Sequence, residues 1–371
     1  MTPALLPLAP LVPRRPDRDA GPASALAATV VAHPRLRVAH DRAMEVLTSP
    51  ADHPFVLVVG PGGVGKTALI RMIDNALAYE SREAMRDNPS LRPAIVVDTP
   101  ASWTGRFNFV ALWERIIEAA EAPAIEHLTG DSVISLGVRA GVNNRRGDRA
   151  KDMYRLAVRT CRDRGVRTIL LDEANHLSVL AGSAHAPEQL DVLKDFAAAA
   201  GVRILLVGAF PVLAFRDISF QVARRIRTVP FLGYEAGIER ERKAFATAAT
   251  TMLELMAGVD VTPDEALIDE LLSGSVGCIG SLRNWLVEAE HHIGRSGGRS
   301  TLAVALRQTA YPASALRQAA AEIESGKRML AGDGPAKAAR AYVPPRTASG
   351  QVLLPGEPRP VRLEMGAGDV A

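Results

Sequence analysis

Short apolar runs and amphipathic helical patterns alternate along the first two thirds of the chain. The apolar runs are rich in Val, Ile and Leu and cover residues 55–59, 94–98, 168–171, 202–208 and 228–232. Between them, apolar residues recur three and four positions apart, which predicts helices over residues 36–47, 68–79, 107–120, 151–164, 187–200 and 211–216. Strands that alternate with helices form a parallel sheet with helices on both faces. We therefore expect an α/β domain over residues 35–233.

From residue 234 onward the pattern is helical throughout. We expect helices over residues 238–256, 262–272, 281–289, 300–309 and 313–330. The second begins with Thr262-Pro263-Asp264-Glu265, a capping box with proline at the first helical position. Residues 234–331 are therefore expected to form a small all-helical domain behind the α/β domain.

Both ends of the chain lack this periodicity. Residues 1–34 contain seven prolines, which interrupt any helix, and we expect a flexible or loosely docked arm there. Residues 332–371 are rich in Pro, Gly, Ala and Arg, which predicts a disordered tail. Either end could bind another protein.

Composition sets wide bounds on what the protein does. The 371 residues include 44 basic and 41 acidic side chains, and a net charge of +3 does not by itself indicate a nucleic-acid-binding protein. The two cysteines, Cys161 and Cys278, have no metal-ligand spacing, which favours buried thiols and a reducing, cytoplasmic location. No apolar run reaches membrane-spanning length, and the proline-rich N-terminus does not resemble a signal peptide.

The first apolar run leads into a glycine-rich turn and then into a helix. This is the strand–loop–helix order of a P-loop, in which backbone N–H groups surround phosphates and the helix N-terminus adds its dipole. The lysine reaches the β- and γ-phosphates, and the following hydroxyl binds Mg²⁺. We expect ATP to be bound by Gly60, Pro61, Gly62, Gly63, Val64, Gly65, Lys66, Thr67 and Ala68.

The apolar run at residues 168–171 ends in two adjacent acids, Asp172 and Glu173. This is the Walker B arrangement. Asp172 would hold Mg²⁺ together with Thr67, and Glu173 would polarise the water that attacks the γ-phosphate. The presence of Glu173 predicts a hydrolase.

A weakly patterned stretch, residues 121–148, and the start of the next helix carry several basic residues with few acids nearby. Such a loop can contact nucleic-acid phosphates without reading sequence, although a solvated loop is the commoner explanation for a charge cluster. The candidate DNA contacts are Arg139, Arg145, Arg146, Arg149 and Lys151.

Taken together, these motifs resemble the AAA+ ATPases, and among them the transposition regulators of the TniB/TnsC group and their relatives MuB and IstB. The resemblance spans residues 36 to about 295. It is carried by the P-loop, by Ala223-Arg224-Arg225-Ile226, by Ile204-Leu205-Leu206-Val207-Gly208, by Gly280-Ser281-Leu282-Arg283, and by the run from Ile169 through Asp172 and Glu173 to Leu177. It implies a P-loop NTPase (AAA+) parallel sheet followed by an all-α lid.

The resemblance also implies a function. Such proteins assemble as homo-oligomers on double-stranded DNA in an ATP- and Mg²⁺-dependent way, recruit or stimulate a transposase and other element-encoded proteins, and disassemble on hydrolysis. Arg225, with Arg224 as second choice, resembles the arginine finger that reaches the neighbouring subunit's γ-phosphate. Arg283 resembles the lid sensor of nucleotide state.

This sequence departs from the pattern of these ATPases at one position. In them, the strand that corresponds to the run ending at residue 208 usually ends in a polar side chain that senses the nucleotide, but here the sequence continues Gly208-Ala209-Phe210. Hydrolysis could therefore be slow, or a backbone group could do the sensing. In P-loop ATPases a segment before the first strand often closes over the adenine, and Val38 and Ala39 are candidates for that contact as well as for simple core packing.

Two other functions remain open at this point. One is a P-loop switch that binds ATP and a protein partner without DNA, and the other is a helicase-loader-like AAA+ protein. A GTPase is disfavoured because no Asn-Lys-x-Asp motif occurs.

Overall fold

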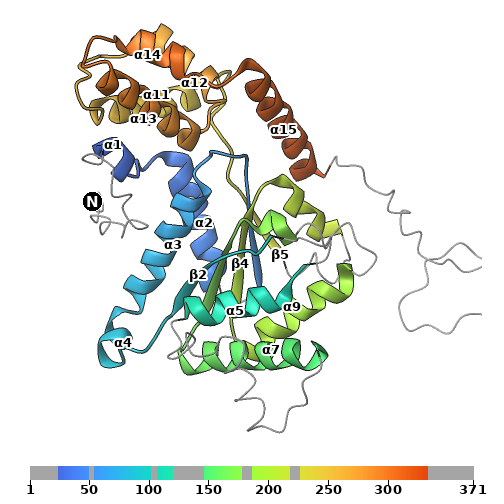
Figure 1. Cartoon of the computed structure of the whole chain (residues 1–371). Coiled ribbons are helices and arrows are strands. Elements are labelled where there is room, and N and C mark those ends of the chain that lie inside the picture. Colours follow the sequence, from blue (N-terminus) through green and yellow to red (C-terminus); the bar gives the residue numbers. More distant parts are fainter. Residues whose placement is uncertain are drawn as a thin grey trace, which may run out of the picture.

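The structure is a computed structural model that describes residues 24–49, 54–101, 107–120, 146–177, 186–217 and 226–332. Two layers of helices enclose a central sheet, and a helical domain lies at one end of that sheet (Figure 1). No helix within these ranges is long and apolar enough to cross a membrane.

The sheet has five parallel strands in the order β2-β3-β4-β1-β5. They are β1 (Phe55–Val59), β2 (Ala94–Asp98), β3 (Thr168–Asp172), β4 (Arg203–Gly208) and β5 (Ile226–Pro230). The expected parallel α/β sheet is thus confirmed, and only β5 begins two residues earlier than predicted. Because all strands run the same way, the loops after β1 and β3 emerge at the same edge of the sheet.

Alternate residues of β1 face opposite helical layers. Phe55, Leu57 and Val59 lie in one core with α5 (Phe109–Ala119), α7 (Arg146–Asp163) and α9 (Ala186–Ala200). Val56 and Val58 lie in the other core with α2 (Pro34–Thr48) and α3 (Lys66–Glu80). All five residues of β1 are buried, as expected for a strand covered on both faces. A short helix, α4 (Arg82–Asp87), follows α3.

The helical domain has a core of its own. It is built from α11 (Glu239–Glu254), α12 (Glu265–Gly274), α13 (Ile279–Arg295) and α14 (Leu302–Thr309). At its centre the indole N–H of Trp285 donates to the carbonyl of Leu306 at 3.1 Å. The predicted start of α12 is wrong: its N-cap is Asp264, whose carboxylate accepts from the backbone N–H of Leu267 at 2.8 Å, so the capping box at Thr262 is not used.

The stretch before α2 is also more ordered than expected. A short helix, α1 (Ala25–Ala28), places Leu26 fully buried in the core of the helical domain, and the hydroxyl of Ser24 bonds to Glu290 of α13. For residues 24–33 the expectation of a flexible arm is therefore wrong, whereas docking, the other expectation, is seen at Leu26. The last proline before this stretch is Pro22, so nothing prevents one helical turn from docking its leucine.

The last helix, α15 (Ala313–Ala331), leads from the helical domain back to the α/β domain (Figure 1). It packs on η3 (Phe210–Asp217), which is a 3₁₀ helix where an α-helix is predicted. The guanidinium of Arg216 donates to the carbonyl of Met329 at 2.7 Å, and Gly326 lies against the ring of Phe210. The two domains are thus joined by α15 as well as by the linker after β5.

Candidate functional site

The glycine-rich loop joins β1 to the N-terminus of α3. Its last glycine, Gly65, is the N-cap of α3 and has a φ of 112°, a conformation that residues with a side chain rarely adopt. The helix therefore begins at Lys66 with its first N–H groups directed toward the loop. This end of the helix can bind an anion.

Lys66 folds over the loop that precedes it. Its ammonium group donates to the carbonyl of Gly60 at 3.1 Å and to that of Pro61 at 2.8 Å. Burial lowers the pKa of Lys66, and the nearby Glu173 and Asp172 oppose that shift. The cation is thus held between the loop and the acid pair.

Asp172 joins the two motifs. Its Oδ2 accepts a hydrogen bond from the Thr67 hydroxyl at 3.1 Å, and its Oδ1 accepts from the backbone N–H of Glu173 at 2.8 Å. Burial raises the pKa of Asp172, while these two hydrogen bonds oppose the shift. Thr67 and Asp172 are 105 positions apart in the sequence, yet their side-chain oxygen atoms lie together at the edge of the sheet.

Glu173 follows β3 directly and precedes η2 (Ala174–Leu177). Its φ is 51°, an uncommon value for a residue other than glycine. Unlike Asp172, Glu173 is exposed, and it lines the same cavity as the glycine-rich loop. Uncommon backbone conformations of this kind concentrate at functional sites.

The cavity has a volume of about 420 Å³ and lies between the α/β and helical domains. One end is formed by the glycine-rich loop and the acid pair. α13 and the segment that precedes α2 complete its wall, and that segment contributes Ala27, Ala28, Val30, Val31 and His33. Sequence reasoning missed this segment because it was assigned to the arm. The His33-Pro34 pair, an N-cap followed by proline at N1, could have identified the start of α2.

Neither candidate for an adenine contact lines this cavity. Ala39 is buried in the core, and Val38 is 49% exposed and faces a groove on the other side of α2. Leu36, in the first turn of the helix, lines the cavity instead. Ala39 thus agrees with the alternative of simple core packing, and only the first turn of α2 lines this cavity.

Arg283 on α13 lines the cavity, as the lid-sensor prediction requires. Its guanidinium donates to the carbonyl of Ala27, and its Nε is buried and has no hydrogen-bond partner in the described part of the chain. Burial, and then the nearby Arg71, lower the pKa of Arg283. The arginine thus holds the segment before α2 against the cavity.

Some of the other predicted functional residues lie outside the described ranges. These are the arginine-finger candidates, Arg224 and Arg225, and two of the candidate DNA contacts, Arg139 and Arg145. Arg146 begins α7, but its side chain is not described. On the same helix, Arg149 pairs with Glu114 at 3.0 Å, and Lys151 is exposed.

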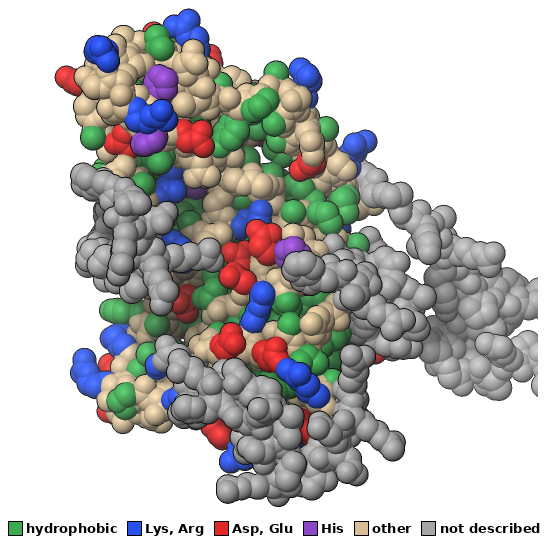
Figure 2. Space-filling view, viewed as in Figure 1, with side chains coloured by type: hydrophobic (Ala, Val, Ile, Leu, Met, Phe, Trp, Pro, Cys, Tyr) green, Lys and Arg blue, Asp and Glu red, His purple; other side chains and the backbone are tan. Residues whose placement is uncertain are grey.

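Among the described side chains on the face shown in Figure 2, Lys and Arg are interspersed with Asp and Glu. Along α7, Arg155 pairs with Asp152 at 3.7 Å and Arg159 pairs with Asp163 at 3.4 Å. Of the exposed cations described on this helix, Arg149, Arg155 and Arg159 are therefore paired with acids.

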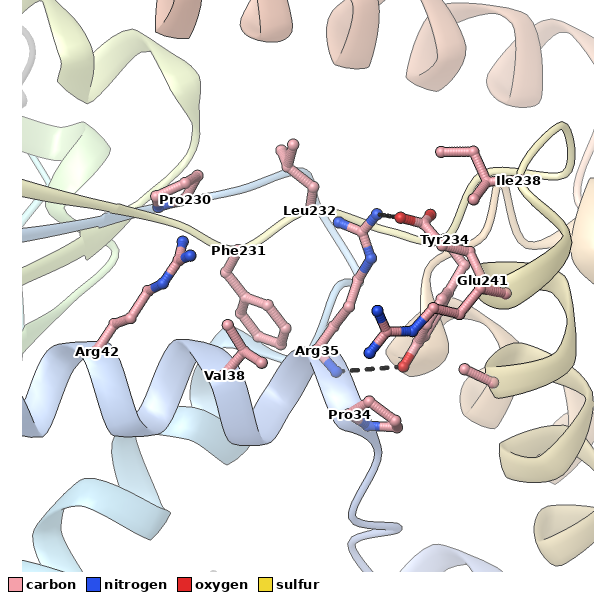
Figure 3. A pocket seen from close by; sticks show the side chains of 12 residues that line it. Pro34, Arg35, Val38, Arg42, Pro230, Phe231, Leu232, Tyr234, Ile238 and Glu241 are labelled. Atoms are coloured by element: carbon pink, nitrogen blue, oxygen red, sulfur yellow. Dashed lines mark hydrogen bonds and ion pairs between the residues drawn. The ribbon is translucent and has the colours of Figure 1, made fainter.

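A second groove, of about 590 Å³, lies on the other side of α2 (Figure 3). It is formed by α2, by the linker after β5 and by α11. Arg35 of α2 reaches across it to Glu241 of α11, and the backbone N–H of Arg35 donates to the hydroxyl of Tyr234 at 3.3 Å. The groove is separated from the first cavity by Phe231 and Tyr234, on which His33 packs.

A lysine-threonine P-loop, an acid pair at the end of the third strand, and a helical domain over the cavity together define the AAA+ P-loop fold. In agreement, residues 51–211 match the model of a family described as an AAA domain. This segment begins shortly before β1 and ends within η3.

Among solved structures, the chain is similar to a Walker-type ATPase of Pyrococcus abyssi, with 17% identity over 82% of this chain and 77% of that one and a TM-score of 0.46. It is also similar to the ORC2 protein of Aeropyrum pernix, with 16% identity over 74% and 66% of the two chains and a TM-score of 0.47. Likeness at this level says nothing of what this chain binds. No curated protein matches it in sequence.

Proposed function

We propose that this protein is an ATPase whose nucleotide state controls its assembly on double-stranded DNA, and that it serves as a regulator of DNA transposition. The observation that carries the ATPase proposal is the contact between Thr67 and Asp172, at 3.1 Å, beside Lys66. Two motifs far apart in sequence meet there in the arrangement that phosphoryl transfer needs.

The residues at this edge of the sheet fit a magnesium ion. The hydroxyl of Thr67 and the carboxylate of Asp172 are hard oxygen donors, which Mg²⁺ prefers. Within the described ranges no group of three or more His, Cys, Asp or Glu side chains could hold a metal. Mg²⁺ is usually bound by one or two carboxylates together with phosphates and water. When bound, Mg²⁺ neutralises charge on the phosphate oxygens.

The roles of the chain's own groups follow from their positions. Backbone N–H groups of the glycine-rich loop and Lys66 bind the phosphates, and Glu173 accepts a proton from the attacking water. Arg225 or Arg224 of a neighbouring subunit would stabilise the charge of the transition state, an effect worth about 10³–10⁵ in rate in other systems. Hydrolysis would then depend on homo-oligomer assembly.

The DNA and transposition parts of the proposal are supported by the residues that resemble the transposition regulators. Two of the runs that carry this resemblance line the cavity, one through Asp172 and Glu173 and the other through Gly280 and Arg283. DNA would be bound through phosphate contacts from residues 139–151, and transposase and other element-encoded proteins would be the partners.

A second function, an ATP switch that binds a protein partner without DNA, is favoured by one observation. Three arginines of α7, Arg149, Arg155 and Arg159, are already paired with acidic side chains. A helicase-loader-like role has no comparable support in the described residues.

Retention on duplex DNA separates these functions. We expect a slowly hydrolysed ATP analogue to raise the affinity for a DNA duplex of arbitrary sequence, and we expect that affinity to fall steeply with salt. Fluorescence anisotropy at several salt concentrations measures both. If the analogue binds with no gain in DNA affinity, the DNA proposal fails and the ATPase proposal stands.

A further inference from the structure

A buried histidine belongs to the segment before α2 that lines the cavity. His33 is 3% exposed, and its ring stacks on Phe231 with the ring centroids 6.2 Å apart. It lines the same cavity as Lys66 and Asp172. Nothing in the roles assigned so far uses this side chain.

The hydrogen bonds of the ring define which nitrogen carries the proton. Nδ1 accepts from the backbone N–H of Leu36 at 3.4 Å, as the N-cap of α2, and it lies 3.0 Å from the hydroxyl of Tyr234. That hydroxyl accepts from the N–H of Arg35, so it can give its own proton to His33. Nδ1 is therefore an acceptor.

The ring is neutral at physiological pH. Burial, followed by the charges of Arg35 and Arg37, lowers the pKa of His33 to about 4. A neutral imidazole whose Nδ1 accepts carries its proton on Nε2. Within the described residues Nε2 has no hydrogen-bond partner, and it is not among the polar atoms sealed away from solvent without one. The ring thus presents one fixed donor at the cavity.

The walls around this donor suit a flat, largely apolar group. Val30, Val31, Leu36 and Ile279 line the same cavity as His33, and α13 adds Asn284. A purine has apolar faces and ring nitrogens that accept hydrogen bonds in its plane. With phosphates at the glycine-rich loop, the base would lie against these apolar side chains.

We propose that His33 binds the purine base, its Nε2–H donating to a ring nitrogen of the nucleotide. This rests on the proposed ATPase function and adds a base-binding residue to it. The network of Leu36, Tyr234 and Arg35 holds the imidazole in the donating tautomer.

The test pairs a change in the base with a change in the protein. Affinities for ADP and for 1-deaza-, 3-deaza- and 7-deaza-ADP are measured by calorimetry for the wild type and for His33→Ser and His33→Phe. Serine keeps an N-cap acceptor for α2, and phenylalanine keeps an aromatic ring on Phe231. One deaza analogue should bind the wild type about five- to tenfold more weakly than ADP, as expected for the loss of one buried hydrogen bond. Both variants should bind that analogue and ADP equally.

His40→Phe is the matched control. His40 lies on the same helix, pairs with Asp41 at 3.0 Å and does not line the cavity, so this variant should keep the wild-type discrimination. If no deaza analogue loses affinity for the wild type, or if the loss persists in both His33 variants, the inference is overturned while ATP binding stands. If neither ADP nor inorganic tripolyphosphate binds the wild type, the proposed function fails as well.

Discussion

The backbone N–H of Ser281 donates a hydrogen bond to the carbonyl oxygen of Gly63 at 2.8 Å. The first residues of α13 therefore touch the glycine-rich loop itself, and the helical domain contacts the phosphate end of the cavity without an intervening side chain. A Cβ on the neighbouring Gly280 would lie 2.5 Å from the Gly63 carbonyl oxygen. This approach requires glycine at position 280.

Gly280→Ala should therefore separate the helical domain from the glycine-rich loop. It should also weaken nucleotide binding by about tenfold or more, because the Gly63 carbonyl cannot move without changing the shape of the phosphate-binding loop. Gly294→Ala is the matched control: it lies on the same helix and its Cβ would meet nothing within 4 Å. That change should raise stability by up to about 1 kcal/mol and leave affinity unchanged. Calorimetric titration with ADP measures the difference, and equal affinities of the two variants would exclude a role for the contact.

Lys66→Ala should abolish nucleotide binding. The variant removes the ammonium group that lies between the loop carbonyls and the acid pair, and with it a charge-assisted contact to phosphate. Lys243→Ala on α11, which breaks only the pair with Glu239, should bind like the wild type. Retained affinity of Lys66→Ala for ATP would contradict the assignment of the loop.

Glu173→Gln should bind ATP with nearly unchanged affinity but hydrolyse it about a hundredfold more slowly or worse, because the amide cannot accept the proton of the attacking water. It should also remain longer on DNA if hydrolysis drives disassembly. Phosphate release and DNA dissociation are measured in parallel with Glu118→Gln, an exposed glutamate on α5, as control. Normal phosphate release by Glu173→Gln would remove this residue from the mechanism.

The parallel sheet and the two motifs could be predicted because their signals are local. The run of residues 55–67 contains its own strand, turn and helix start, and Asp172 and Glu173 follow a run of buried aliphatic residues. Parallel strands place such loops at one edge, so their meeting follows from topology.

The segment before α2, part of which lines the cavity, could not be predicted in the same way. Its residues come from a stretch whose apolar side chains show no period, and their partners, such as Glu290 and Arg283, are more than 250 residues away. The burial of Leu26 depends on a core formed by α11 to α14. Long-range packing of this kind leaves no mark in the local pattern.

Gly326→Ala should loosen the attachment of α15 to the α/β domain. A Cβ at this position would lie 2.3 Å from the ring of Phe210, so the helix or the ring must shift. We expect a loss of about 1–3 kcal/mol in stability, although a glycine-to-alanine change inside a helix is usually favourable. Ser325→Ala, at the exposed neighbouring position, is the control, and denaturant unfolding gives both values. If Gly326→Ala were as stable as Ser325→Ala, the contact between α15 and Phe210 would not hold the helix in place.

The neutral His33 should make stability depend on pH between about 4 and 6.5. The unfolded chain binds a proton at this histidine below its ordinary pKa of 6.5, whereas in the folded chain burial and then Arg35 and Arg37 lower the pKa to about 4. The unfolded state thus binds more protons in this window, and stability falls as pH falls through it. The lowered pKa of His33 corresponds to about 3 kcal/mol in the free energy of unfolding, which is fully present above pH 6.5 and is lost by pH 4. Denaturant unfolding of the nucleotide-free wild type and His33→Phe over this range measures it. Since both proteins share all other titrating groups, their difference isolates this side chain, and parallel pH profiles would show that His33 is not held neutral by the fold.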